Sequence, residues 1–311
     1  MTARRSLYAA VDVGSHSAKL LIARPARDGS WQSEFAAVTV TGLGGGGALG
    51  LDPAGRSRAI ATLRDFAAAI AARNVAGVAA VGTMALRQAP DAASFVAAVR
   101  AETGLSLEVI SGDEEARLAY LGARINLPSA VPAGASVLVF DVGGASTEFA
   151  WGRGRQPAGR RSLALGTLGL ARRCSLEDAA SSERVREALG EVRRLVADVE
   201  PAGDPSALLG IGATPASLLA LACGRAIADG AEVHGQRLEP AVVAEQIERL
   251  RGLDAARRRR LPGLHPDRDR VILAGAVIVA GIADRWSAAP LLVSAHGLRL
   301  GLLADRFGAQ P

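Results

Sequence analysis

Aromatic residues and cysteines are scarce in this sequence of 311 residues. Phe, Trp and Tyr together make up 4% of the chain, so alanine, leucine, valine and glycine must fill most of any core. The two cysteines, Cys174 and Cys223, have no CxxC spacing and are too few for a disulfide framework. We therefore expect free thiols in a reducing compartment, and the composition excludes a small disulfide-stapled secreted domain.

Lysine is almost absent. Lys19 is the only lysine among 36 basic residues, which face 31 acidic residues and give a net charge of +5. A GC-rich genome favours arginine codons and accounts for most of this bias. Arginine also grips phosphate groups in bidentate fashion, so such a surface would suit a polyanion. No long basic run or aromatic-studded patch accompanies the arginines, and we expect no nucleic-acid partner.

Long hydrophobic runs are missing as well. The most apolar stretch, residues 271–283, has 13 residues, short of the ~20 that cross a bilayer. Residues 1–10 carry two arginines but lack the apolar run of a signal peptide. We therefore expect a cytoplasmic protein without a membrane partner.

The sequence does contain an internal repeat. Residues 7–22 and 136–150 each begin with an apolar strand that runs into Asp-Val-Gly, and each continues through small residues into a second strand. The two aspartates, Asp12 and Asp141, are 129 positions apart, which is about the length of a domain. Because helices and strands alternate after each copy, the chain belongs to the α/β class. The duplication narrows this to an actin-like (ribonuclease H-like, ASKHA) two-domain fold with an interdomain cleft.

The expected domains are residues 1–125, the N-terminal actin-like domain, and residues 126–311, the C-terminal one. The segment 126–135, which contains two prolines and a glycine, is the expected connection between them. Apolar spacing predicts helices that include residues 57–72, 113–124, 268–283 and 298–307, the last of which would close the second domain.

The two Asp-Val-Gly loops form the first candidate site. Glycine allows a tight turn and brings backbone N–H groups close to a ligand, and neighbouring hydroxyls can complete a phosphate cradle. An aspartate at the mouth of each loop, Asp12 or Asp141, can hold a hydrated Mg²⁺ ion. An ordinary hairpin turn is the alternative for either loop alone, but the repetition favours a site. The candidate phosphate-binding residues are Gly14, Ser15, His16 and Ser17 in the first loop and Gly143, Gly144, Ala145, Ser146 and Thr147 in the second.

An acidic cluster occupies residues 111–117, where a strand is expected to turn into a helix. Ser111 and Glu114 have the spacing of a capping box, and acids in a first helical turn suit the helix dipole. These structural roles account for Asp113 and Glu114. They leave Glu115, whose carboxylate could act as a general base on a water molecule in the cleft.

A third glycine-rich stretch, residues 209–215, follows an expected strand and opens a helix. Backbone N–H groups at a helix N-terminus bind phosphate, which makes Gly212 and Thr214 further candidates. Glycine is common at such turns, so this stretch alone indicates little.

Several ordered motifs together resemble one known family. The chain is similar to the exopolyphosphatase/guanosine pentaphosphate phosphatase (Ppx/GppA) family over essentially its whole length, as a short two-domain member. The matching segments are residues 10–17, 82–90, 109–118 and 141–148, followed by 234–235, 261–264 and 294–301.

The resemblance implies a magnesium-dependent hydrolase, in a homodimer, that releases terminal phosphate from inorganic polyphosphate or from pppGpp. It makes Glu115 the base that activates water, with Glu148 assisting the water or the metal. Asp141, with Asp12 as a second candidate, would position Mg²⁺. The path of the phosphates would be lined by Thr83 and Arg87.

The chain departs from the family pattern at several positions. His16 replaces an asparagine, Ala145 and Ala213 replace glycines, and no arginine is present in the sequence around Thr41. Leu300 stands where an acid is common. His16 and Thr41 would face substrate phosphates, so these two departures bear on substrate choice.

Three alternatives to an exopolyphosphatase remain open. The same residues could act on pppGpp. Kinases and chaperone-like ATPases share the two-loop architecture, and residues 210–214 could then form the adenosine site. A non-catalytic sensor of polyphosphate or nucleotides is the third alternative. The presence of all four candidate acids argues against the sensor: Asp12, Glu115, Asp141 and Glu148.

Overall fold

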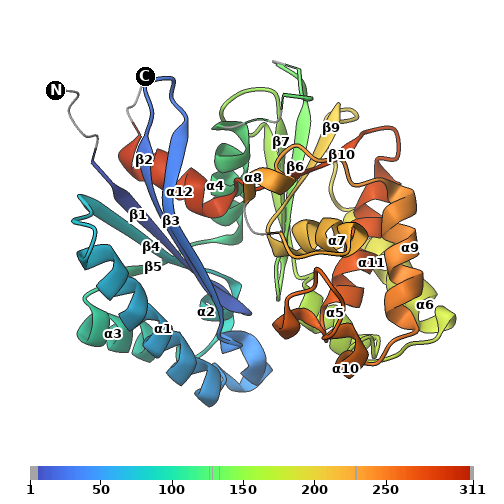
Figure 1. Cartoon of the computed structure of the whole chain (residues 1–311), viewed down its shortest axis with the longest axis horizontal. Coiled ribbons are helices and arrows are strands. Elements are labelled where there is room, and N and C mark those ends of the chain that lie inside the picture. The colour runs from blue at the N-terminus through green and yellow to red at the C-terminus, as the bar shows by residue number, and fades with distance from the viewer. Residues whose placement is uncertain (1–5, 126, 128, 133, 228–229, 309–311) are drawn as a thin grey trace. The chain divides into compact units, whose positions relative to one another are not determined.

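The chain divides into two compact units, described here from a computed structural model that covers residues 6–308 apart from 126, 128, 133, 228 and 229 (Figure 1). Unit 1 comprises Met1–Asn126 together with Leu298–Pro311, and unit 2 comprises Leu127–Gly297. Each unit has its own five-stranded sheet.

The strands of the two sheets follow one plan. In unit 1 the order is β3-β2-β1-β4-β5. In unit 2, counted from the corresponding edge, it is β8-β7-β6-β9-β10. The strands of unit 1 are β1 (Tyr8–Val13), β2 (Ser17–Pro25), β3 (Trp31–Val40), β4 (Gly77–Gly82) and β5 (Leu107–Val109). Those of unit 2 are β6 (Val137–Val142), β7 (Thr147–Gly152), β8 (Gly159–Leu163), β9 (Ala207–Ile211) and β10 (Leu291–Ser294).

Pairing directions repeat as well. β1 pairs antiparallel with β2 and parallel with β4, and β6 pairs antiparallel with β7 and parallel with β9. The outer strands β5 and β10 are parallel to β4 and β9. The duplicated actin-like topology predicted from the repeat is therefore confirmed.

Helices connect and cover these strands. In unit 1 they are the 3₁₀ helix η1 (Leu43–Leu49), α1 (Pro53–Ala71), α2 (Met84–Gln88), α3 (Ala92–Thr103), α4 (Gly112–Ile125) and α12 (Leu298–Phe307). In unit 2 they are α5 (Thr167–Arg173), α6 (Ser182–Val196), α7 (Ala213–Cys223), α8 (Gly230–Val233), α9 (Pro240–Arg251), α10 (Ala255–Arg258), the 3₁₀ helix η2 (Pro266–Arg268) and α11 (Ile272–Arg285).

Both faces of the unit 1 sheet are covered, and the burial of β1 shows this. Its last five residues are all buried, as expected for a strand with a layer on each side. Val11 and Val13 pack in the cluster that contains α1 and α3, whereas Ala10 packs in the cluster of α4 and α12. Because side chains alternate along a strand, Asp12 is directed to the face that carries α4.

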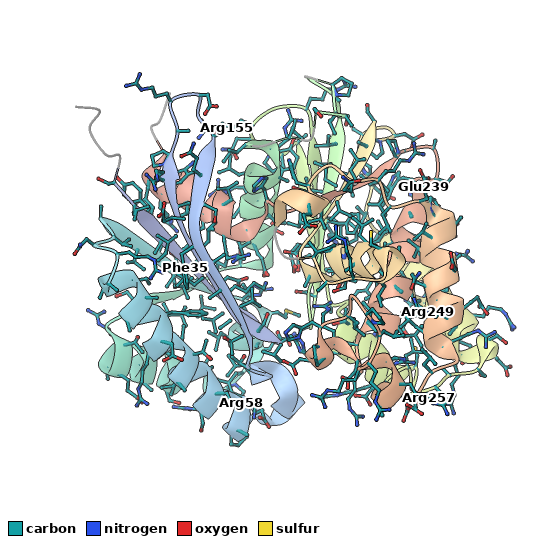
Figure 2. The ribbon with its side chains drawn as sticks, viewed as in Figure 1. Phe35, Arg58, Arg155, Glu239, Arg249 and Arg257 are labelled. Carbon is teal, nitrogen blue, oxygen red and sulfur yellow. The ribbon has the colours of Figure 1, made fainter. Side chains whose placement is uncertain are left out.

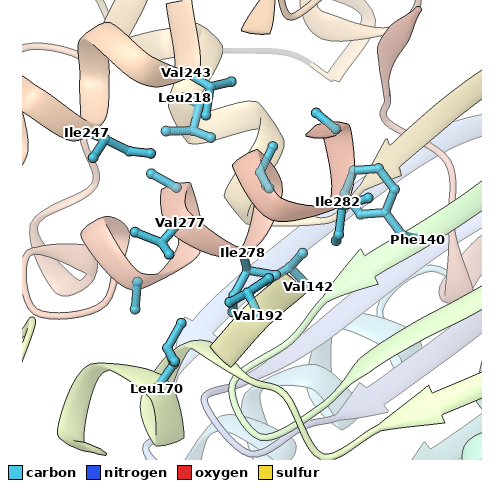
Figure 3. Packing of buried hydrophobic residues seen from close by; sticks show 14 of the residues in the cluster. Phe140, Val142, Leu170, Val192, Leu218, Val243, Ile247, Val277, Ile278 and Ile282 are labelled. Carbon is cyan, nitrogen blue, oxygen red and sulfur yellow. The ribbon is translucent and has the colours of Figure 1, made fainter. Parts of the chain in front are cut away.

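In unit 2 one helix, α11, forms the centre of the core. All but three of its fourteen residues are buried, so the apolar stretch of the sequence is an interior helix. Figure 3 shows Ile278 and Ile282 of α11 against Phe140 and Val142 of β6. Alternation along β6 then directs Asp141 to the opposite face of the sheet from Phe140 and Val142.

The position of α12 differs from the expected division at residues 125 and 126. The sequence predicts the last helix in the second domain, but this helix packs on α4 and β1 and belongs to unit 1. Gly301 makes the close approach possible, because a Cβ there would lie 1.8 Å from the carbonyl oxygen of Leu118. Leu298 and Leu302 join Leu118 in one buried cluster.

Other boundaries shift by a few residues. The helix expected at 57–72 begins at Pro53, because Asp52 caps it by accepting a hydrogen bond from Gly55 N. The helix expected at 268–283 spans Ile272–Arg285. Three positions of the expected connection 126–135 lie outside the described residues. Within the described ranges, no helix is long and apolar enough to cross a membrane.

Candidate active site

The first loop joins β1 to β2 and is held by backbone hydrogen bonds. Gly14 N donates to Ser17 O (3.0 Å), which closes the turn. His16 O accepts from the backbone nitrogens of Thr41 and Gly42, both at 3.0 Å. A Cβ on Gly14 would lie 3.3 Å from Ser17 O, so the turn has little room for a larger residue.

An arginine reaches this loop from α1. Arg58 Nε donates to Thr41 O at 2.9 Å, and a Cβ on Gly42 would lie 3.2 Å from Arg58 Nη2. The sequence around Thr41 lacks an arginine, but the fold supplies a guanidinium from a residue 17 positions away. No spacing rule pointed to it, because the contact depends on how α1 packs.

Asp12 is paired with the only lysine of the chain. The two residues face each other across β1 and β2, and Lys19 Nζ lies 2.8 Å from Asp12 Oδ2. Asp12 is buried, with 3% of its surface exposed. A buried carboxylate needs a compensating charge, and Lys19 supplies it, so Asp12 would have to share its carboxylate to contact a metal ion.

The fold joins two predicted site residues that are 28 positions apart, Arg87 and Glu115. Arg87 Nη1 lies 2.7 Å from Glu115 Oε2 and also donates to Ile110 O at 3.0 Å. Arg87 Nη2 contacts Met84 Sδ at 3.4 Å. Both charged side chains are largely buried, with exposures of 18% and 13%. The guanidinium therefore fixes the orientation of the Glu115 carboxylate.

Thr83 stands beside this pair at the start of α2. Its N donates to Val13 O (3.2 Å), which ties α2 to the end of β1. A Cβ on Gly14 would lie 3.9 Å from Thr83 Oγ1 and 4.0 Å from Asp12 Oδ1. Thr83 and Asp12 thus both lie close to Gly14 in unit 1.

Glu114 and Glu115, adjacent in sequence, have different partners. Ser111 Oγ accepts from Glu114 N at 3.1 Å, which confirms the helix cap. The Glu114 carboxylate binds Arg117 in bidentate fashion, at 2.8 and 2.7 Å, and Arg117 also bonds Asp305. Its hydrogen bond to Glu114 raises the pKa of Arg117 above its ordinary value. Glu114 is therefore structural, and Glu115 is the acid directed to Arg87.

The second loop, in unit 2, rests on the N-terminus of α5. Gly143 N donates to Ser146 O (2.9 Å), as its counterpart Gly14 does to Ser17. The carbonyls of Gly143 and Gly144 accept from Thr167 N and Leu168 N, at 3.0 and 2.8 Å. These carbonyl contacts hold the loop in place. A Cβ on Gly166 would lie 2.3 Å from the carbonyl carbon of Ala145, so only glycine fits there.

Glu148 is buried, and β8 helps to position it. Glu148 Oε1 accepts from Ser162 Oγ at 2.9 Å, and the two residues are directly opposite in the β7–β8 register. Thr147, the next residue back, is fully buried and its hydroxyl donates to Leu165 O. The Thr147 side chain therefore secures the hairpin, and the predicted phosphate contact is not available to its hydroxyl.

The third glycine stretch lies against Asp141. Gly212 has φ +83°, and a Cβ there would lie 2.5 Å from Asp141 Oδ1. Glycine is thus required both by its backbone conformation and by the carboxylate beside it. Thr214 is fully buried, with its hydroxyl 3.5 Å from Val142 O. Its side chain, like that of Thr147, serves the fold.

Sequence reasoning missed Arg268, which approaches the same stretch from η2. Arg268 Nη2 donates to Thr214 Oγ1 at 2.9 Å, and Arg268 Nε is buried with no hydrogen-bond partner among the described residues. Burial lowers the pKa of Arg268 to about 10, so it remains charged at neutral pH. No carboxylate in the described ranges forms an ion pair with it. A half-buried cation whose Nε has no partner in the described ranges is suited to bind an anion.

The donors for a metal ion are few. Across the described part of the chain, no three His, Cys, Asp or Glu side chains gather as a metal site. Mg²⁺ is commonly held by one or two carboxylates, with water and phosphate oxygens as the remaining ligands. Asp141, fixed against Gly212, fits that role, and Lys19 makes Asp12 the weaker candidate.

Two α/β units of one topology, each with an Asp-Val-Gly loop between its first two strands, define a duplicated actin-like fold. Within that class, residues 45–309 match the Ppx/GppA phosphatase family. The chain belongs to this family of phosphatases.

Relatives of known name or structure agree with this assignment. Exopolyphosphatase 2 of Mycobacterium tuberculosis is 31% identical, over 96% of this chain and 98% of its own. The Aquifex aeolicus PPX-GPPA enzyme has 29% identity and a TM-score of 0.82, over 97% of this chain and 99% of its own. An exopolyphosphatase from Cytophaga hutchinsonii shares the fold, with a TM-score of 0.87 at 21% identity, over 98% of this chain and 99% of its own.

Proposed function

We propose that this protein is a magnesium-dependent exopolyphosphatase that releases the terminal phosphate of inorganic polyphosphate. The family is one of phosphatases, and Exopolyphosphatase 2 of M. tuberculosis is similar over nearly the whole of both chains. The chemistry proposed is attack of water on a terminal phosphoanhydride, with a general base on the water and cations on the phosphate oxygens.

The Arg87–Glu115 pair is the observation that carries the proposal. A general base must be held in one orientation so that its oxygen meets the attacking water. Arg87 fixes Glu115 in that way, while the neighbouring Glu114 is bound to Arg117. We assign the proton acceptor to Glu115.

Unit 2 has its own candidate groups for binding a strongly anionic substrate. Asp141 would hold Mg²⁺, which when bound neutralises charge on the phosphate oxygens. Backbone N–H groups of Gly144 and Ala145 are donors for phosphate oxygens. Arg268 adds a half-buried positive charge beside Thr214 with no carboxylate partner in the described ranges. Each of these groups favours a strongly anionic substrate.

The decisive experiment is the isosteric change Glu115→Gln. Phosphate release from polyphosphate in the presence of Mg²⁺ should fall by about 10²–10⁴-fold, the usual contribution of a general base. Glu114→Gln is the matched control, because it alters the adjacent acid and should keep most of the activity. Near-normal turnover by a folded Glu115→Gln protein would contradict the assignment.

The second candidate substrate is pppGpp. It is favoured by the similarity to the Aquifex protein, which carries both family names. Phosphate release from long polyphosphate, tripolyphosphate, pppGpp and ATP, each with and without Mg²⁺, separates the candidates. A protein that releases phosphate from pppGpp but not from polyphosphate would overturn the first choice and leave the assignment of Glu115 intact.

A further inference from the structure

The excess positive charge of the chain is concentrated in one segment. Residues 149–176 contain six arginines and no acidic residue. The remaining 30 basic residues are balanced by all 31 acidic residues. Codon bias explains why the basic residues are arginines, but it does not explain why the acids avoid this one segment.

Four of the six arginines lie on the β7–β8 hairpin. Arg153 and Arg155 are in the turn, Arg160 and Arg161 are on β8, and all four are exposed. Arg155 is labelled in Figure 2. Because β8 is the edge strand of the unit 2 sheet, its outer side is not covered by another strand.

The hairpin is directly connected to a candidate catalytic residue. Ser162 of β8 donates to Glu148 of β7. Arg160 lies two residues before Ser162, so it is on the same face of the sheet and about 7 Å along the strand. Arg160 therefore lies on the Glu148 face of the hairpin, and Arg153 and Arg155 follow in the turn, whereas Arg161 is on the opposite face.

The aromatic residues of the hairpin lie on the face opposite Glu148, because side chains alternate along β7. Phe149 is fully buried, and Trp151 is half-buried and packs against the core and Gly159. Surfaces that bind single-stranded nucleic acids combine positive charge with aromatic side chains on which bases stack. This hairpin offers positive charge alone, which fits a polyanion that has no bases.

We propose that the β7–β8 hairpin binds the distal part of a polyphosphate chain whose terminal phosphate is at the site that contains Glu148. The proposal rests on the proposed function and adds to it a surface that distinguishes long chains from short ones. Arginine suits the role because its planar guanidinium matches phosphate oxygens in bidentate fashion. A chain of three phosphates is too short to reach the turn.

The test is the double variant Arg153→Ala/Arg155→Ala, which removes both exposed arginines of the turn and leaves β8 unchanged. The KM for long polyphosphate at low salt should rise about three- to tenfold, as expected for two exposed charge contacts. The KM for tripolyphosphate and the kcat for both should not change. The slope of log affinity against log salt should fall by about two.

Arg184→Ala/Arg186→Ala is the matched control. It removes two exposed arginines from α6 of the same unit, and thus the same net charge, at a site unrelated to Glu148. If both double variants change the long-chain KM equally, the effect is one of net charge and the proposal is wrong. The proposal is also wrong if the hairpin substitutions raise the KM for tripolyphosphate as much as the KM for long polyphosphate.

Direct binding separates this proposal from the proposed function. Labelled long polyphosphate is titrated with the Glu115→Gln protein, with and without the two hairpin substitutions, and the anisotropy is recorded. Loss of binding in the hairpin variant supports the surface even if no hydrolysis is found for the parent protein. Tighter binding of single-stranded RNA than of polyphosphate, abolished by the same substitutions, would overturn the choice of polyphosphate.

Discussion

Lys19 Nζ lies 2.8 Å from the buried Asp12 Oδ2, and the chain has no other lysine. In an arginine-rich sequence this one ammonium compensates a carboxylate inside the first loop. Lys19→Met should therefore destabilise the protein by about 2–3 kcal/mol, because it leaves a buried charge unpaired. Urea unfolding measures the loss. Asp12→Asn/Lys19→Met should recover most of it, and a Lys19→Met protein as stable as the parent would show that the pair has no such role.

Gly212 and Asp141 give a prediction about the metal. Gly212→Ala forces a Cβ into the Asp141 carboxylate at a position with φ +83°, so the carboxylate must move. The Mg²⁺ concentration for half-maximal activity should rise severalfold, with about 1 kcal/mol of lost stability. Gly224→Ala is the control, because Gly224 has φ +64° and nothing within 4 Å of its Cβ. If the two variants need the same Mg²⁺ concentration for half-maximal activity, Gly212 is not part of a metal site.

Arg268 predicts opposite effects on stability and on substrate binding. Replacing a half-buried cation that has no carboxylate partner in the described ranges by an apolar side chain is expected to be neutral or stabilising, so Arg268→Met should unfold at the same or a higher urea concentration. The KM for polyphosphate should rise about tenfold, because a charged contact to phosphate is lost. Arg270→Met removes an exposed arginine two positions away and should change neither quantity. A destabilised Arg268→Met protein with normal KM would mean that the residue is structural.

His296 predicts a pH dependence of stability. Burial, and then the nearby His234 ring, lower the pKa of His296 to about 4 from 6.5. The unfolded chain binds this proton at a higher pH than the folded chain does. Stability should therefore be complete above about pH 6.5 and decrease by up to about 3 kcal/mol as the pH falls toward 4. His296→Gln should reduce that slope, and an unchanged slope would contradict the shift.

Local patterns predicted much of the architecture. The repeat gave both Asp-Val-Gly loops because each is a strand, a turn and a strand in consecutive residues. The helix cap at Ser111 and Glu114 was predictable for the same reason, and it left Glu115 as the acid that the fold directs to Arg87.

Contacts between distant segments were not predictable. The place of α12 depends on a glycine, Gly301, that matters only when α4 lies against it. Arg58 at Thr41 and Arg268 at Thr214 are contacts over 17 and 54 positions. The hydroxyls of Thr147 and Thr214 resembled phosphate ligands in sequence, but backbone carbonyls in the fold accept from them.

The return of α12 to unit 1 also sets an order for synthesis on the ribosome. Unit 2 is one continuous stretch, Leu127–Gly297, whereas unit 1 is formed by a segment before that stretch and a segment after it. Nascent domains usually fold in the order in which they emerge. Here the half that emerges first lacks α12 until residues 298–307 have been synthesised, so the half that emerges second is the first that can complete its core.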